Sequence, residues 1–584
     1  MRILFLTHSF NSLTQRLFVE LEARGHEVSV EFDIADSVAE EAVALFRPEL
    51  VVAPYLRRAI PESVWRQHAC LVVHPGIVGD RGPSALDWAV MDDECEWGVT
   101  VLQANAEMDA GDIWATEAFP MRSVKKSSLY RNEVTEAATR AVLAAVERFA
   151  AGTFRPRPLD PSGSDVRGRL RPLMKQTHRA IDWQRDDTAV VLRKIRAADG
   201  FPGVLDSLFG VPCYLFDAHE EAELRGETPG EIIAKRDGAL LRSTCDGALW
   251  IGHVKRAHTA AGEAPAFKLP ATVAFASEAS AVPEMPLAPD AVCSGPSYRE
   301  IHYEECRVGG AAIGFLRFEF YNGAMSSEQC ARLLAAYTHA RSRPTQVIVL
   351  LGGEDFWSNG IHLNMIEASA SPADESWRNI NAIDELARAI IETGSHLTVA
   401  ALQGNAGAGG CFLALAADLV WARAGVTLNP HYKNMGNLYG SEYWTYLLPR
   451  RIGMDRARAI MANRLPLAAP AAATQGMIDA AFATDVASFR EEVGRRAAAL
   501  AGAADFADQL AAKRARRAAD EASKPLAAYR AEELEHMRRN FYGFDPSYHV
   551  ARYHFVHKTP HSWTPRHLAR HRDIGWSASL RDAA

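Results

Sequence analysis

The chain has 584 residues, which at roughly 100 to 200 residues per domain implies three or four domains and excludes a single core. Its 64 Lys and Arg residues against 72 Asp and Glu residues leave a formal net charge of -8, so no general positive field exists to hold nucleic acid or an anionic membrane. The 48% hydrophobic and 23% charged fractions are those of an ordinary soluble protein.

The N-terminal segment predicts a doubly wound α/β domain over residues 1–155. Apolar strands alternate with helical periods through short connections, which favours a parallel sheet. The strands are expected at 2–7, 26–32, 50–54 and 70–74, and the helices at 13–24 and 37–46. The first strand leads into polar residues without a small-residue cleavage site, so it is no signal peptide, and we expect a cytoplasmic enzyme.

The rest of the chain divides at two segments rich in Pro, Gly, Ala or Ser, 152–172 and 276–297, which we interpret as linkers. Between them, short strands alternating with turns predict a small β-barrel of OB type over 176–275. A second α/β domain is expected over 298–500, followed by a helical, His- and aromatic-rich extension over 501–584. The uncharged run 397–417 contains polar residues and four glycines, so we expect a buried strand, turn and helix there and no membrane span.

Residues 71–113 combine a His at a strand end, His74, with an Arg-Gly-Pro loop at 81–83, a Gly-Val-Thr strand at 98–100 and an Asp-Ala-Gly-Asp turn at 109–112. This pattern resembles the 10-formyltetrahydrofolate-dependent formyltransferases and implies that His74 and Asp109 are catalytic. Formyl transfer passes through a tetrahedral oxyanion, which an imidazole held by a carboxylate can stabilise. Val72 stands where that family has Asn, which puts an amine acceptor in doubt.

Two further residues of the first domain are candidates for binding the substrates. Gln15 lies in the helix after the first strand, where Asn11 can cap that helix, and Arg131 could meet folate carboxylates or a coenzyme A phosphate. Parts of 176–275 resemble the C-terminal domain of methionyl-tRNA formyltransferases, but acidic side chains there argue against tRNA.

The segments 351–367 and 402–422 resemble the two signature segments of the enoyl-CoA hydratase/isomerase (crotonase) family. The resemblance implies that the backbone amides of Asn359 and Gly409 hold a thioester oxygen, with Gly360 and Gly410 letting the bare backbone approach coenzyme A. Phe412 and His431 replace the two Glu residues of the hydratases, so water addition is not expected. Among the remaining polar residues, which are His362, His431, Tyr432, Tyr439, Glu442 and Tyr443, we select Tyr439 and Glu442 as acid or base.

This order of domains resembles the accessory maturation proteins of NiFe-hydrogenases. The resemblance implies formyl transfer from 10-formyltetrahydrofolate to coenzyme A and decarbonylation of formyl-CoA, which yields carbon monoxide for the NiFe site. Two alternatives stay open: a formyl-CoA-forming transferase or formyl hydrolase whose second domain only binds coenzyme A, and a non-catalytic assembly scaffold. We expect small-molecule substrates, hydrogenase maturation chaperones as partners, a monomer and no metal. For the tail histidines, including His567 and His571, we favour packing or anion contacts over metal binding.

Overall fold

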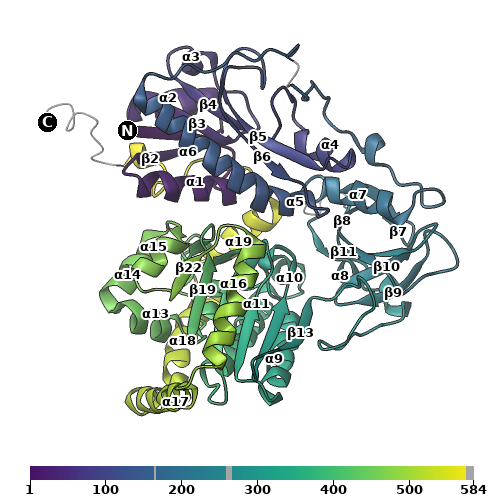
Figure 1. Cartoon of the computed structure of the whole chain (residues 1–584), viewed down its shortest axis with the longest axis vertical. Coiled ribbons are helices and arrows are strands. Elements are labelled where there is room, and N and C mark those ends of the chain that lie inside the picture. The colour runs from purple at the N-terminus through teal and green to yellow at the C-terminus, as the bar shows by residue number, and fades with distance from the viewer. Residues whose placement is uncertain (164–165, 258–265, 574–584) are drawn as a thin grey trace. The chain divides into compact units, whose positions relative to one another are not determined.

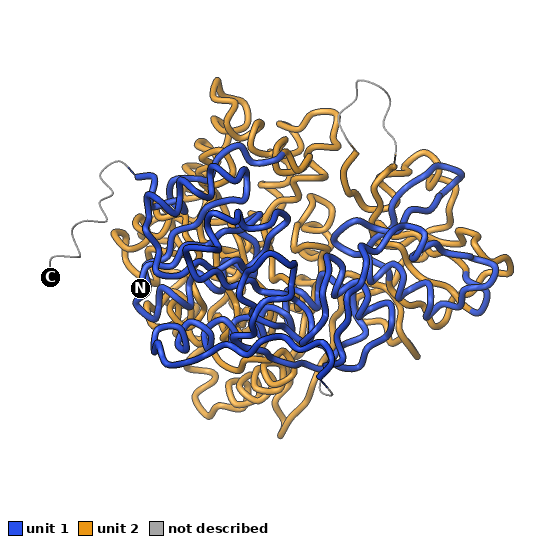
Figure 2. Tube along the Cα trace, turned by 90° about the horizontal axis from the view of Figure 1, so that it is seen from above, with its two compact units in different colours: residues 1–218, 244–246, 560–584 blue, residues 219–243, 247–559 orange. Residues whose placement is uncertain are grey.

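A computed structural model describes residues 1–163, 166–257 and 266–573. The chain forms two compact units, coloured separately in Figure 2. Unit 1 comprises residues 1–218, 244–246 and 560–584, and unit 2 comprises residues 219–243 and 247–559. The division into four segments made from the sequence stays a prediction.

Unit 1 contains a six-stranded sheet in the order β2-β1-β3-β4-β5-β6 (Figure 1). The strands are β1 (Arg2–Thr7), β2 (Glu27–Phe32), β3 (Leu50–Tyr55), β4 (Cys70–His74), β5 (Glu96–Gln103) and β6 (Ile113–Pro120). The first four strands are parallel, as predicted, whereas β5 runs antiparallel to both of its neighbours, β4 and β6. The connection between β5 and β6 contains no helix, and a parallel pair requires a longer crossover.

Helices cover both faces of this sheet because its central strands are apolar at consecutive positions, such as Ile3 to Leu6 in β1. On one face, α2 (Asp36–Phe46) buries Val43 and Phe46 in a cluster with Leu4 and Leu6 of β1. The strand alternation points Ile3 and its apolar neighbours to the other face. Helix α1 (Ser12–Ala23) packs on β2 and β3, and α6 (Thr135–Ala151) packs on β5 and β6.

The described residues of the first predicted linker, 152–163 and 166–172, have almost no regular structure, but the segment is hydrogen-bonded to other residues of unit 1. Its Gly168 amide donates to the Val78 carbonyl at 3.2 Å, and the Arg171 amide donates to the Arg81 carbonyl at 2.9 Å. Gly82 lies close to the same segment, since a Cβ on it would come 2.3 Å from the Arg171 carbonyl oxygen. The linker therefore supports the loop that follows β4. Beyond it, α7 (Thr188–Ala198) precedes the antiparallel hairpin β7 (Val204–Leu208) and β8 (Val211–Glu221).

The end of the chain returns to unit 1 and covers β2, which is the edge strand of the sheet. The Val30 amide donates to the Leu568 carbonyl at 3.0 Å, and the Phe32 amide donates to Thr564 Oγ1 at 2.8 Å. His571 is buried and lies between Ser29 and Glu31, so it has the packing role predicted for it. Pairing along an edge strand removes a site for unwanted strand association.

Unit 2 contains an antiparallel group of strands, β9 (Ile232–Arg236), β10 (Ala239–Ser243), β11 (Ala248–Arg256) and β12 (Leu269–Pro270). Its main sheet has the order β13-β14-β15-β17-β19-β22, formed by Ile301–Val308, Ala311–Phe318, Val347–Leu351, Leu397–Leu402, Leu419–Arg423 and Ala480–Phe482. A second sheet, β16-β18-β20-β21, is formed by Phe356–Ser358, Asn405–Gly407, Thr427–Asn429 and Leu467–Ala468. The two segments that resemble the crotonase signatures begin where β15 and β17 of the main sheet end, and they contain β16 and β18 of the second sheet.

Several helices of unit 2 share one large apolar core. They include α9 (Ser327–Ser342), α11 (Pro372–Ile391), α12 (Gly409–Leu415), α13 (Trp444–Ile452) and α18 (Leu526–Tyr542). Helix α18 contributes Leu526, Met537 and Phe541 to that core, although it lies far along the chain. The uncharged run 397–417 forms β17, β18 and α12, as predicted. Among the described residues, no helix is both long and apolar enough to cross a membrane.

Candidate active sites

His74 ends β4 and lies between two carboxylates. Its Nε2 is 3.0 Å from Asp80 Oδ1, and its Nδ1 is 3.5 Å from Asp109 Oδ2. His74 and Asp80 are 5% and 2% exposed, so little water screens this triad. An imidazole ring held between two carboxylates has a fixed orientation from which it can stabilise a developing oxyanion.

Two features of the backbone near His74 permit this arrangement of the three side chains. A Cβ on Gly76 would come 2.3 Å from His74 Nε2, so the ring can lie there only over a glycine. Asp109 has a left-handed backbone, with φ of 55°, and accepts a hydrogen bond at Oδ2 from the Gly82 amide at 3.2 Å. The structure therefore brings His74 and Asp109 together, as the motif predicted.

Gln15 and Arg131 come from two elements that a hydrogen bond joins. Asn11 caps α1 by accepting from the Thr14 amide at 3.0 Å, as predicted, and its Nδ2 donates to the Tyr130 hydroxyl at 3.2 Å. Tyr130 begins the π-helical turn Tyr130–Val134 that contains Arg131. Their role in binding folate or coenzyme A stays a prediction.

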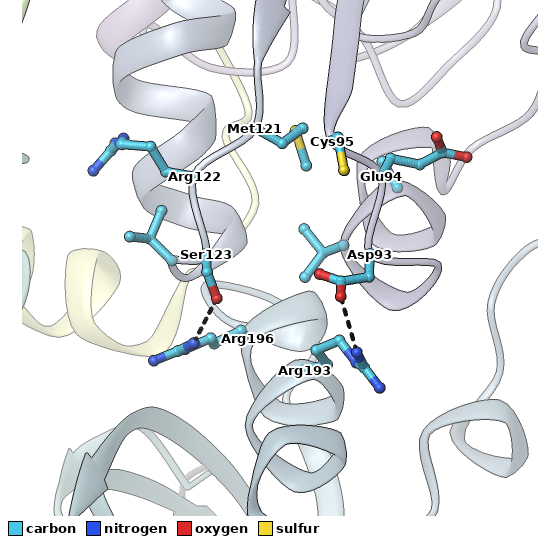
Figure 3. A pocket seen from close by; sticks show the side chains of 11 residues that line it. Asp93, Glu94, Cys95, Met121, Arg122, Ser123, Arg193 and Arg196 are labelled. Carbon is cyan, nitrogen blue, oxygen red and sulfur yellow. Dashed lines mark hydrogen bonds and ion pairs between the residues drawn. The ribbon is translucent and has the colours of Figure 1, made fainter.

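Figure 3 shows a cavity of about 140 Å³ in unit 1 that none of the predicted site residues lines. Arg193 donates to Asp93 and Arg196 donates to Ser123 at its rim. Cys95, which lines it, precedes β5, whereas Asp109 follows that strand at its other end. The cavity is therefore separate from the His74 site.

In unit 2, the two crotonase-like segments meet at the start of α12. A Cβ on Gly360 would come 3.3 Å from the Gly409 nitrogen, and one on Gly410 would come 2.0 Å from the Ser358 carbonyl oxygen. Trp357 Nε1 donates to the Gly410 carbonyl at 2.9 Å and ties the segments together. Glycine is required at both positions because the backbones are in direct contact.

The two predicted oxyanion amides differ in their surroundings. The Asn359 amide donates to the Gly323 carbonyl at 2.7 Å, and the Asn359 side chain donates to the Asn322 carbonyl at 2.8 Å. Gly409 is the first residue of α12, where an N–H has no acceptor within the helix and lies at the positive end of its dipole. Asn359 would have to exchange its bond to Gly323 in order to hold a substrate oxygen, whereas Gly409 would not.

The Glu442 carboxyl lies directly over Gly409. A Cβ on Gly409 would come 2.0 Å from Glu442 Oε1, and Glu442 is 1% exposed. Burial and the neighbouring Asp384 carboxyl raise the pKa of Glu442 to about 8. The Tyr432 hydroxyl donates to Glu442 Oε2 at 2.5 Å, and Phe412, at the position of a hydratase Glu, stacks on the Tyr432 ring. The Gly409 amide can bind the oxygen of an acyl thioester, and the Glu442 carboxyl can move a proton beside it.

The structure does not bring Tyr439 into this group. Its ring stacks on His536 at a centroid distance of 4.0 Å, and its amide donates to Asn540 at 3.1 Å. Tyr432 occupies the position next to Glu442 that was expected of Tyr439. A signal for Tyr432 existed, because it follows the His431 that replaces a hydratase Glu.

Asp80 was not predicted from the sequence as part of the site around His74. It lies six residues after His74 in a loop, and no periodic pattern marks it.

Family models match three parts of the chain. They are "Formyl transferase" at 6–146, "Formyl transferase, C-terminal domain" at 173–268 and "Enoyl-CoA hydratase/isomerase" at 311–565. A methionyl-tRNA formyltransferase from Halalkalibacterium halodurans is 24% identical over 233 residues, which are 39% of this chain and 72% of that protein. The predicted formyltransferase and crotonase-like parts are thus confirmed and support an enzyme.

Two proteins match almost the whole chain. Hydrogenase maturation factor HoxX from Bradyrhizobium diazoefficiens is 57% identical over 573 residues, which are 98% of this chain and 97% of that protein. The crystal structure of HypX from Aquifex aeolicus in complex with tetrahydrofolic acid has a TM-score of 0.94 at 48% identity and covers 99% of this chain and all of that one. The chain therefore belongs to the HypX/HoxX family of hydrogenase maturation factors.

Proposed function

We propose that this protein makes carbon monoxide for the NiFe site of hydrogenase in two steps. The first step moves the formyl group from N10 of 10-formyltetrahydrofolate to the thiol of coenzyme A, which leaves tetrahydrofolate with an N–H. The second step cleaves formyl-CoA into carbon monoxide and coenzyme A. The tetrahydrofolic acid in the HypX structure and the formyltransferase family match support the first co-substrate.

The His74 site suits the first step. Attack of the thiolate on the formyl carbon produces an oxyanion, which the imidazole ring of His74 can stabilise while Asp80 and Asp109 hold the ring. An amine nitrogen must lose a proton after it attacks the formyl carbon, whereas a thiolate sulfur carries none, so a thiol acceptor does not need the Asn that Val72 replaces. Gln15 and Arg131 are our candidates for binding the substrates.

The observation that carries the second step is the Glu442 carboxyl beside Gly409. With the formyl oxygen on the Gly409 amide, the formyl hydrogen faces this buried carboxyl group. Glu442 takes that hydrogen as a proton, the C–S bond breaks, carbon monoxide leaves, and the proton passes to the coenzyme A sulfur. Tyr432 shares its hydroxyl hydrogen with Glu442 and can assist the return of the proton. An oxyanion donor of this kind contributes about 10² to 10³ in rate.

The decisive experiment supplies 10-formyltetrahydrofolate with a ¹³C-formyl group, together with coenzyme A, to the purified protein under anaerobic conditions. We expect ¹³CO, trapped on myoglobin and identified by its carbonyl band. Glu442→Gln should accumulate formyl-CoA without carbon monoxide, because it keeps the volume but removes the base. Folate turnover without carbon monoxide in the wild type would leave the transferase alternative, and no turnover of either compound would leave the scaffold alternative.

A further inference from the structure

The Glu442 carboxyl depends on an unusual turn, residues 441–443. Glu442 and Tyr443 both have left-handed backbones, with φ of 58° and 60°. Neither is glycine, so each of these backbone conformations is strained unless the surroundings stabilise it. All three residues are at most 1% exposed, so water cannot satisfy their backbone groups. Other side chains of unit 2 must therefore bond the backbone groups of this turn and stabilise its conformation.

Asp384 of α11 holds the first half of the turn. Its Oδ1 accepts from the Glu442 amide at 2.8 Å, and its two oxygens accept from the Ser441 hydroxyl at 2.9 and 2.8 Å. Asp384 is completely buried, and the nearest guanidinium, on Arg530, lies 3.6 Å away. A buried carboxylate with this set of donors is bonded mainly to the turn.

Glu533 of α18 holds the second half. Its Oε2 accepts from the Tyr443 amide at 3.0 Å, and its Oε1 accepts from the Thr445 amide at 2.8 Å and the Thr445 hydroxyl at 2.5 Å. Tyr443 is the N-cap of α13, so Glu533 caps that helix from another element and lies at the favourable end of its dipole. The turn is thus fixed between two helices that are remote in sequence.

We propose that Asp384 and Glu533 are positioning residues, which hold the 441–443 turn so that the Glu442 carboxyl faces the acyl group beside Gly409. The inference rests on the proposed function for the identity of that acyl group. The hydrogen bonds of both carboxylates are made to the turn and to the start of α13, so each acts on the acyl site through Glu442. Helix α18 thereby belongs to the machinery of the second site.

The same arrangement couples the charge of Glu442 to its neighbours. Burial and the Asp384 carboxyl raise the pKa values of both Glu442 and Glu533 to about 8, and burial raises the pKa of Asp384 to about 6. The ionisable groups around Glu442 come from several elements, namely Asp384, Glu533, Arg530, Tyr432, Tyr443, Cys330 and Cys411. Removing a negative neighbour should therefore lower the pKa of Glu442.

Asp384→Asn and Glu533→Gln separate charge from hydrogen bonding. Asp384→Asn keeps one carbonyl oxygen that can accept from the Glu442 amide, and it removes the negative charge. In Glu533→Gln, the NH2 group replaces an oxygen that accepts an amide N–H, so one bond of the turn is lost. The first change should move the pH dependence, and the second should lower kcat by about tenfold to hundredfold with little change in KM.

The experiment follows the infrared band of the protonated Glu442 carboxyl, identified by its loss in Glu442→Gln, and the pH profile of formyl-CoA cleavage. In Asp384→Asn, the midpoint of this infrared band, which is the pH at which half of the band is lost, should fall by about one unit. The acid limb of the pH profile for formyl-CoA cleavage should fall by the same amount. Glu300→Gln is the control, because Glu300 is also a buried carboxylate of unit 2 but binds Arg332 and Gln329. It should leave the midpoint and kcat unchanged.

An unmoved midpoint in Asp384→Asn, or wild-type kcat in Glu533→Gln, would overturn the positioning role. A shift of the same size in Glu300→Gln would also overturn it, since the effect would then be general. If the wild type cleaves no formyl-CoA while the infrared midpoint still moves in Asp384→Asn, the proposed function fails and the positioning of Glu442 stands.

Discussion

Gly409→Ala tests the contact between the acyl site and its base most directly. The new Cβ would lie 2.0 Å from Oε1 and 2.4 Å from Cδ of Glu442. Non-bonded carbon atoms pack at about 3.5 Å, so the carboxyl must retreat by about 1 Å. A misplacement of about 1 Å can cost about 10² in rate, which corresponds to about 2.7 kcal/mol of transition-state stabilisation. The buried methyl group should also destabilise unit 2 by about 1 to 3 kcal/mol.

The assay measures carbon monoxide from supplied ¹³C-formyl-CoA and, separately, consumption of 10-formyltetrahydrofolate. We expect Gly409→Ala to slow the first about a hundredfold and to leave the second unchanged, because His74 lies in unit 1. Gly494→Ala is the matched control, since a Cβ there meets nothing within 4 Å. Wild-type carbon monoxide release by folded Gly409→Ala would refute the reasoning.

A double variant shows whether the loss arises from the displaced carboxyl. Glu442→Ala removes the group that the methyl would contact, so adding Gly409→Ala to it should slow cleavage little further. A second hundredfold loss in the double variant would mean that the methyl acts on the bound acyl group and not through Glu442.

Three other variants test contacts elsewhere in the two units. Tyr432→Phe removes the hydroxyl bonded to Glu442 and should slow carbon monoxide release at least about tenfold, whereas Tyr439→Phe should remain within about twofold; equal effects in the same assay would contradict the assignment. His74→Ala should lower folate consumption by about 10² to 10⁴ but spare cleavage of supplied formyl-CoA, and loss of both in a folded variant would contradict separate sites. Glu31→Gln should lower the free energy of unfolding by about 3 kcal/mol at pH 7, measured with urea, because it breaks the buried contact with the C-terminal segment.

The stabilisation that Glu31 contributes to folding should fall at acid pH. Burial alone would raise the pKa of Glu31, but hydrogen bonds from His571, Thr564 and Arg572 outweigh burial and lower it. The stabilisation is therefore complete above the pKa of an unfolded Glu, about 4.5, and is lost as the pH falls through the lower folded value. The difference between wild type and Glu31→Gln should shrink below about pH 4.5, and a constant difference would contradict this account.

Local patterns in the sequence were sufficient for much of the fold and for the formyltransferase and crotonase-like parts. The strands of the first sheet up to His74, the cap at Asn11 and the strand-to-helix turn at Gly409 each depend on residues close together in the chain. The same holds for the two motifs that identified a formyl-transfer site and an acyl-thioester site. The reversed direction of β5 was not predicted, because the apolar pattern of a strand is the same in either direction.

The tertiary structure decided which groups meet at each site. Asp80 faces His74 from a loop without any pattern, and Tyr432 rather than Tyr439 bonds Glu442. Asp384 and Glu533 bind the turn of Glu442 from 58 and 90 residues away in the chain. Neither separation has a periodic signature, because packing of α11 and α18 on one core creates these contacts. Side chains that hold a buried, left-handed turn are therefore visible only once the helices that carry them are packed together.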